Sequence, residues 1–190
     1  MRMSLKGLGV VVWLALLPVA GASATELVTD GGFEAGDLGA WSLTDSSGFS
    51  GLTTPGHSGS YAAALGAEQT DGTLGQVLST VNGQSYSLTF WLANNSDTPT
   101  TNFEVSVGGV VLDSLSNSAV FDFQQFTYNF IASGANTQLL FTARNDDGFW
   151  FLDDVSVTES RDTNPAPEPM TLSLLGAGLA GFGAMRRMRK

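Results

Sequence analysis

Residues 85–92 read Ser-Tyr-Ser-Leu-Thr-Phe-Trp-Leu, and their alternation decides the fold class of the chain. Successive side chains of a β-strand point to opposite faces, so every second residue here shares a face. One face carries Tyr86, Leu88, Phe90 and Leu92, and the other carries Ser85, Ser87, Thr89 and Trp91. The stretch therefore predicts a strand with one side in a core and one side in water, with Trp91 on the wet side.

The same period continues on both sides of this stretch. Alternating apolar residues recur at 103–107 and 126–130, and the pairs Asn82-Gly83 and Gly108-Gly109 are typical of tight hairpin turns. Short β-rich runs between Gly, Asn, Asp and Ser clusters fill residues 25–158, without a helical period. We expect an all-β domain at 25–158, a jelly-roll β-sandwich of about eight to ten strands.

Charge is distributed unevenly along the chain. The whole chain has a net charge of -10, but residues 25–160 hold sixteen Asp and Glu against Arg144 alone, a net of -15. Such a surface repels phosphate backbones, which argues against nucleic acid as a partner and favours cations. The chain has no cysteine, so disulfides, thiolate metal sites and cysteine nucleophiles are excluded.

The first 24 residues have the pattern of a secretory signal peptide. Arg2 and Lys6 precede an apolar stretch at 8–20, and Ala22-Ser23-Ala24 offers a small-residue cleavage site for signal peptidase. We therefore expect export, and we exclude residues 1–24 from the folded domain.

The other end of the chain has three parts. Residues 159–166 are a polar, proline-containing linker, residues 170–185 carry no charge, and residues 186–190 are basic. The charge-free part favours a single transmembrane helix with the basic residues on the cytoplasmic side. It also contains the pattern G-x-G-x-x-G, but no strand precedes it and no acidic residue follows it, so a dinucleotide loop is not indicated.

These C-terminal residues resemble the PEP-CTERM sorting signal of Gram-negative bacteria over 167–190. The resemblance rests on the tripeptide Pro167, Glu168 and Pro169, the apolar segment, and the cluster Arg186, Arg187 and Arg189. It implies an exosortase as partner and a destination at the cell surface or in an exopolysaccharide matrix. The alternative is a plain membrane anchor, in which the tripeptide has no role.

The domain itself resembles the galactose-binding-like jelly rolls of carbohydrate-binding modules. The resemblance is carried by Asp30-Gly-Gly-Phe-Glu34 at its start and by residues 149–157, Phe-Trp-Phe-Leu-Asp-Asp-Val-Ser-Val, at its end. It implies that the first and last strands lie together and that Glu34, with Asp153 or Asp154, holds a structural calcium ion.

The alternation of residues 149–157 bears on the same carboxylates. Asp153 is in phase with Phe149, Phe151, Val155 and Val157, which predicts that it points toward the core. A buried carboxylate needs a partner, so either Arg144 neutralises Asp153 or a hard cation such as calcium does. The alternative is that both Asp side chains lie at a strand edge in water.

The sequence favours a non-catalytic binding domain. Trp91 is the best candidate for a sugar platform, while Trp150, Trp41 and Tyr61 are weaker candidates because large aromatics are more often core residues. His57, the one histidine, lies in a Pro-Gly-His-Ser-Gly turn that we expect to be exposed. We therefore expect an exported surface or matrix protein associating with polysaccharide; the alternatives are a structural or adhesive membrane-anchored protein without sugar binding, and a glycoside-acting enzyme.

Overall fold

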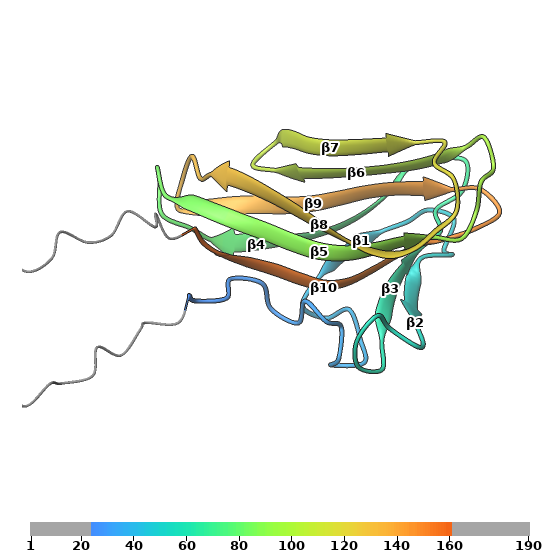
Figure 1. Cartoon of the computed structure of the whole chain (residues 1–190), viewed down its shortest axis with the longest axis horizontal. Helices are drawn as coiled ribbons and strands as arrows, with labels where there is room; N and C mark the ends of the chain where they lie inside the picture. Colours follow the sequence, from blue (N-terminus) through green and yellow to red (C-terminus); the bar gives the residue numbers. More distant parts are fainter. Residues whose placement is uncertain (1–23, 161–190) are drawn as a thin grey trace, which may run out of the picture.

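Ten strands build the domain as two stacked antiparallel sheets (Figure 1). The computed structural model describes residues 24–160. The first sheet has the order β1-β4-β9-β6-β7, and the second has the order β2-β3-β10-β5-β8. The strands are β1 (Ser42–Thr44), β2 (Gly51–Thr53), β3 (Ala62–Leu65), β4 (Gly72–Ser79), β5 (Ser85–Asn94), β6 (Thr101–Val107), β7 (Val110–Ser116), β8 (Phe121–Ile131), β9 (Asn136–Asn145) and β10 (Trp150–Glu159). The predicted all-β sandwich and its strand number are thus confirmed.

The core lies between the two sheets and follows the alternation of β5. Its four inward residues are almost completely buried, and their neighbours Ser87, Thr89 and Trp91 are partly exposed on the outer face. From the facing sheet, β6 and β9 contribute Phe103, Val105, Leu139 and Phe141. Phe90 contacts Phe141 edge-on, with ring centroids 5.3 Å apart, so aromatic packing joins the two sheets.

Two predicted turns are present, and their glycines adopt positive φ values. Gly83 has a φ of 80°, and Gly108 and Gly109 have φ values of 57° and 81°. These left-handed conformations match the right-handed twist of antiparallel hairpins. The turns join β4 to β5 and β6 to β7.

The last strand departs from its predicted phase. The buried residues Trp150 and Leu152 face the core, whereas Phe149 and Phe151 are partly exposed and stack on each other on the outer face. A register shift between Asp153 and Ser156, with Asp154 at a φ of 48°, then returns Val155 and Val157 to the core. The expectation that Asp153 shares a core-facing side with Phe149 and Phe151 is therefore wrong, because a β-bulge changes the phase.

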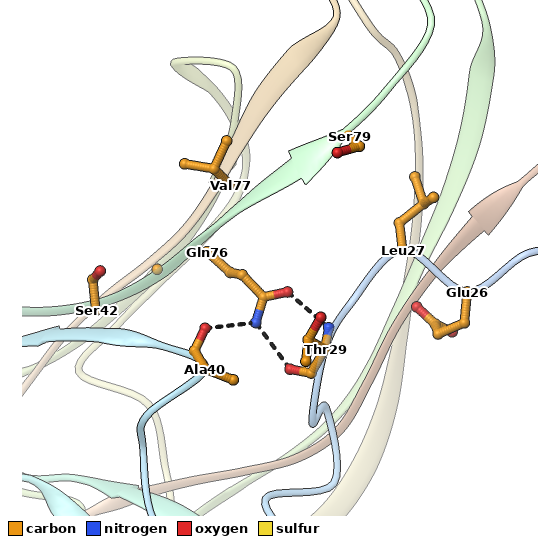
Figure 2. Close-up of a pocket in the computed structure, with 9 residues that line it drawn as sticks. Glu26, Leu27, Thr29, Ala40, Ser42, Gln76, Val77 and Ser79 are labelled. Atoms are coloured by element: carbon orange, nitrogen blue, oxygen red, sulfur yellow. Dashed lines mark hydrogen bonds between the residues drawn. The ribbon is translucent and has the colours of Figure 1, made fainter.

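The segment before β1 closes the sandwich along its edge. The amide of Leu27 donates to the Val157 carbonyl, and Glu26 pairs with Thr158, so the beginning and end of the domain lie side by side as the resemblance implied. Gln76 of β4 fixes this segment to the other sheet (Figure 2). Its side-chain amide donates to the carbonyls of Thr29 and Ala40 and accepts from the Thr29 amide.

Several expectations concern residues outside the described range. The signal peptide at 1–24, apart from its last residue, and the sorting signal with its apolar segment at 170–185 belong to this group, as does most of the linker. Within residues 24–160, no helix is long and apolar enough to cross a membrane.

Candidate functional site

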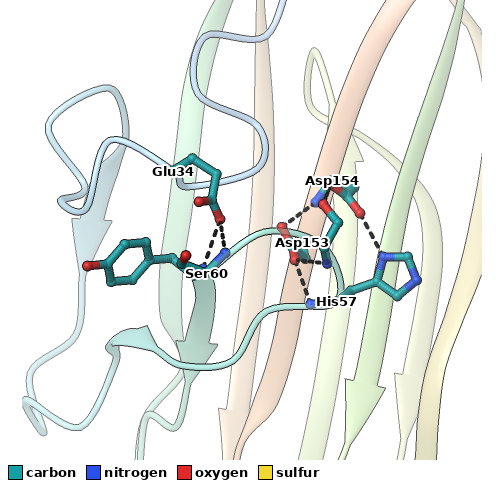
Figure 3. A network of polar contacts seen from close by, with 7 residues as sticks. Glu34, His57, Ser60, Asp153 and Asp154 are labelled. Atoms are coloured by element: carbon teal, nitrogen blue, oxygen red, sulfur yellow. Dashed lines mark hydrogen bonds and ion pairs between the residues drawn. The ribbon is translucent and has the colours of Figure 1, made fainter.

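A loop between β2 and β3, residues 55–60, lies over the bulge of β10 (Figure 3). The amides of His57 and Ser58 donate to one carboxylate oxygen of Asp153 at 2.8 and 3.2 Å, and the amide of Asp154 donates to the other at 2.7 Å. The Asp153 side chain points outward from the sheet, but it is completely buried because this loop covers it. Backbone N–H groups, rather than a charged partner, satisfy its oxygens.

Burial raises the pKa of Asp153, and the nearby Asp154 carboxylate acts in the same direction. The hydrogen bonds from the amides of Asp154, Ser58 and His57 oppose this shift. Arg144 takes no part, since its guanidinium binds both oxygens of Asp146 at 2.9 and 2.7 Å. The predicted alternative that Arg144 neutralises Asp153 is therefore wrong.

Glu34 binds the same segment farther along the chain, near Ser60 (Figure 3). One oxygen of its carboxylate accepts from the amides of Ser60 and Tyr61 at 2.7 and 2.8 Å. Gly59, at a φ of 59°, allows this approach, since a Cβ there would lie 2.4 Å from the same oxygen. The three residues proposed from the sequence as calcium ligands, Glu34, Asp153 and Asp154, thus all bind the 55–61 segment.

The donor set is suitable in kind for a hard cation, since it consists of carboxylate oxygens. Most of those oxygens already accept hydrogen bonds, including both oxygens of Asp154, which contact the Ser58 hydroxyl and the His57 ring. Among residues 24–160, no three His, Cys, Asp or Glu side chains are grouped closely enough to hold a metal ion. One oxygen of Glu34, Oε2, is not used in a hydrogen bond within this part of the chain.

Trp91 lies on the outer face of β5, opposite Asp153 of β10, but its ring is not free. The His57 imidazole stacks on it at a centroid distance of 3.8 Å and an interplanar angle of 16°, and Phe123 of β8 lies 5.3 Å from His57. The His57 Nδ1 contacts an Asp154 carboxylate oxygen at 2.7 Å, and its side chain is 27% exposed. The loop is at the surface as predicted, but its imidazole is fixed rather than free in water.

A groove of about 460 Å³ opens beside this stack, at the end of the sheet where β5 finishes. Aromatic rings and polar side chains both line it, in the set Ala93, Asn94, Asn95, Val120, Phe121, Asp122, Phe123 and Phe151. Asn95 and Asp122 are exposed, while Phe123 and Phe151 are partly exposed on the outer face. The arrangement offers apolar ring faces next to a side-chain amide and a carboxylate.

The residues that line this groove lie within the part of the chain that matches a known protein family. Residues 46–158 match the family described as "Protein of unknown function (DUF642)". The chain belongs to the DUF642 family. No curated protein matches its sequence.

Solved structures similar to this DUF642 domain include several carbohydrate-binding modules. TmCBM61, solved in complex with β-1,4-galactotriose, has a TM-score of 0.59 at 17% identity, over 72% of this chain and all of that one. Family 16 Carbohydrate Binding Module-2 has a TM-score of 0.54 at 14% identity, over 70% and 99%. The CBM22-1 xylan-binding domain from Paenibacillus barcinonensis Xyn10C has a TM-score of 0.53 at 11% identity, over 76% and 100%. At sequence identities of 11–17%, this structural similarity establishes a shared fold only.

Of the remaining aromatic candidates, Trp150 and Trp41 lie inside the DUF642 domain, and Tyr61 is partly buried against its core. Trp150 is completely buried and donates its Nε1–H to the Arg144 carbonyl, and Trp41 is 6% exposed and donates to the Asp30 carbonyl. Sequence reasoning missed Phe123 and Phe151. The pattern Phe-Trp-Phe-Leu at 149–152 is apolar at every position, so its period could not show which side faces water.

A second hollow, of about 520 Å³, lies at the opposite edge of the sandwich around Gln76 (Figure 2). Its lining contains no aromatic residue, and the Gln76 amide that lies in it is committed to the Thr29 and Ala40 backbone. This hollow therefore reflects how the N-terminal segment is attached, and the groove beside Phe123 is the better candidate site.

Proposed function

We propose that this domain is a non-catalytic carbohydrate-binding module and that its ligand lies in the groove beside Phe123 and Phe151. The observation that carries the proposal is the pairing of the partly exposed rings of Phe123 and Phe151 with Asn95 and Asp122 in one groove. The Oδ1 of Asn95 accepts from the Phe149 amide, so its NH₂ group is the part offered to a ligand. Sugar rings present apolar C–H faces and equatorial hydroxyls, which such a lining matches by stacking and hydrogen bonding. The similar structures named above, two of them described with galactotriose or xylan, support the same class of ligand.

Trp91 contributes to this site as the next aromatic residue along the face. Its stack with His57 continues the apolar surface from Phe123, because His57 contacts both rings. We therefore keep Trp91 as part of the proposed binding site, with the His57 ring covering it. Trp91→Ala would remove the support of His57 as well as the indole itself.

A catalytic role is not favoured. His57 is engaged with Asp154 and Trp91, and Asp153 is buried beneath the loop, so neither is presented to a substrate. Asp122 is the carboxylate that lines the groove, whereas glycoside hydrolysis in its usual form requires a pair about 5 to 10 Å apart.

The test is a panel of soluble polysaccharides, including β-1,4-galactan, xylan and mixed-linkage glucan, in affinity gel electrophoresis of the full chain in mild detergent. We expect retardation by at least one polymer and no release of reducing sugar during prolonged incubation. Release of reducing sugar would make the domain an enzyme, and no retardation by any polymer, including the exopolysaccharide of the host, would favour a structural role.

We further propose that a calcium ion binds at the 55–61 segment, with Glu34 and Asp153 or Asp154 as its carboxylate ligands, in exchange for some of the hydrogen bonds that these oxygens accept. The ion would pin the loop through Glu34 and Asp154 and thereby fix the His57 stack. Calcium should raise the midpoint of thermal unfolding relative to a chelator, and Glu34→Gln should abolish that difference. Equal midpoints with and without calcium in the native sequence would argue against the ion.

Export and sorting are the second half of the proposed function. The signal peptide and the PEP-CTERM-like tail would bring the domain across the inner membrane, where an exosortase would process it for the surface or the exopolysaccharide matrix. The intact mass of the protein recovered from hosts with and without an exosortase tests this. Loss of the residues after about Pro169 only when the enzyme is present supports sorting, and an intact tail in both hosts supports a plain membrane anchor.

A further inference from the structure

One end of the sandwich is free of charge in its loops, and the other is acidic. The loops at 80–84, 108–109 and 132–135, which join β4 to β5, β6 to β7 and β8 to β9, contain no charged residue. At the opposite end, the loops at 66–71, 95–100 and 146–149 hold Glu68, Asp71, Asp97, Asp146 and Asp147. The two carboxylates nearest the neutral end are Glu26 and Glu159, beside the last residues of β10.

The neutral end also exposes aliphatic side chains. Val81 and Ile131 are 61% and 69% exposed, and they flank the same turn, since Ser85 pairs with Ile131 and the Val81 amide donates to the Tyr86 hydroxyl. Val110, in the neighbouring hairpin, is 65% exposed. Val81 lies in a loop, while Ile131 ends β8 and Val110 begins β7. Exposed aliphatic residues grouped beside loops that carry no charge indicate a contact surface rather than a solvated end.

The chain enters and leaves the domain at this same end (Figure 1). The Ser160 amide donates to the Ser85 carbonyl, and Glu26 pairs with Thr158. Beyond Ser160 the sequence continues with the rest of the linker to residue 166, then the tripeptide at 167–169 and the charge-free stretch at 170–185. An extended linker of this kind reaches at most about 30 Å, at about 3.1 Å per residue. An apolar stretch inserted in a bilayer would therefore keep the neutral end near the lipid.

We propose that the neutral end of the sandwich rests on a lipid surface while the tail is still attached, with Val81 and Ile131 at the boundary between water and lipid. This inference rests on the proposed membrane insertion of residues 170–185. Burial of such side chains is favourable, and the loops bring no charge that must be dehydrated. The aromatic groove, lined by Asn94 and Phe121 where β5 ends and β8 begins, then faces away from the membrane.

The chain has no cysteine, so single labels can be placed without background. Val81→Cys and Ser133→Cys place an environment-sensitive fluorophore at the neutral end, and Asp97→Cys places the same label at the acidic end as a matched control. Each full-length variant is reconstituted into phosphatidylcholine vesicles with and without bromine on the acyl chains. We expect quenching at positions 81 and 133 to be at least roughly two-fold stronger than at 97.

Equal quenching at all three positions in chains that float with the vesicles would overturn the proposed orientation. A full chain that does not float would refute the membrane insertion of the tail, and the orientation with it. The labels at 81 and 133 could instead report an apolar environment in dilute detergent, without vesicles, and do so more strongly as the protein concentration rises. That result would overturn the proposal and assign this end to contact with a second copy of the chain. A further variant tests whether misfolding, rather than contact with lipid, explains the quenching. Ile131→Glu should reduce quenching at 133 while leaving tryptophan fluorescence of the core unchanged.

Discussion

At the scale of single residues, Asp153 shows how a carboxylate is held inside this domain without a cationic side chain. Its two oxygens accept from three backbone amides, and burial raises its pKa. The sequence predicted that Asp153 is buried, but the reason given was wrong. Asp153 is buried by a loop that lies almost a hundred residues earlier in the chain. The local alternation of residues 149–157 cannot predict such a long-range contact.

Asp153→Asn tests this account at the residue scale. An asparagine presents an NH₂ group to at least one of the three N–H donors, so one buried amide loses its acceptor and two donors face each other. We expect a loss of about 1–3 kcal/mol in the free energy of unfolding. Chemical denaturation measures it, with exposed Asp122→Asn as the control. A loss below a few tenths of a kcal/mol would show that the loop does not depend on this carboxylate.

At the scale of elements, the turn between β1 and β2 depends on another carboxylate. One oxygen of Asp45 accepts from the amide and hydroxyl of Ser47, and the other accepts from the amide of Ser50. Burial alone would raise the pKa of Asp45, but these hydrogen bonds outweigh it and lower the pKa below its usual range. The charged form is therefore the one that stabilises the turn.

A pH dependence follows for Asp45→Asn. A lowered pKa in the folded state means that the stabilisation is complete above about pH 4, the pKa of an unfolded Asp, and is lost as the pH falls through the folded pKa. We expect the variant to lose about 1–2 kcal/mol at pH 7 and less at pH 2. Urea unfolding at the two pH values measures this, and an equal loss at both would contradict the assignment.

The attachment of the N-terminal segment to β10 gives a second prediction at this scale. The Val155 amide donates to the Gly31 carbonyl at 2.9 Å, and a Cβ at position 31 would lie 1.8 Å from the Val155 carbonyl oxygen. Gly31→Ala should therefore destabilise the domain by about 1–3 kcal/mol through overpacking. Gly51→Ala is the control, since a Cβ there meets nothing within 4 Å. Similar thermal midpoints for the two variants would contradict the close approach.

Much of this architecture could be predicted from the sequence, and particular residues show why the rest could not. The clear alternation of β5 and the glycines at 83, 108 and 109 predicted strands and turns that are present. His57 was expected in a water-exposed turn, yet it stacks on Trp91, because a contact between a loop and a distant strand leaves no local pattern. The groove depends on Phe123 and Phe151, brought together by the sheet order β10-β5-β8.

At the scale of the whole molecule, the two ends of the sandwich differ in chemistry. The aromatic groove lies at the acidic end, and the chain enters and leaves at the neutral end. A domain tethered through its neutral end would present the groove outward, where a polysaccharide of the surface or matrix could reach it. The high negative charge also favours neutral or cationic polymers over anionic ones as ligands.

The measurement that tests the central proposal most directly is the dissociation constant of the best polysaccharide, or its oligosaccharide, for three forms of the full chain. The native sequence, Phe151→Ala in the groove and Val110→Ala on β7 of the other sheet are compared by isothermal titration calorimetry. We expect Phe151→Ala to weaken binding about ten-fold or more, a loss of about 1.4 kcal/mol, and Val110→Ala to leave it unchanged. Equal dissociation constants for all three forms would show that the ligand does not occupy this groove.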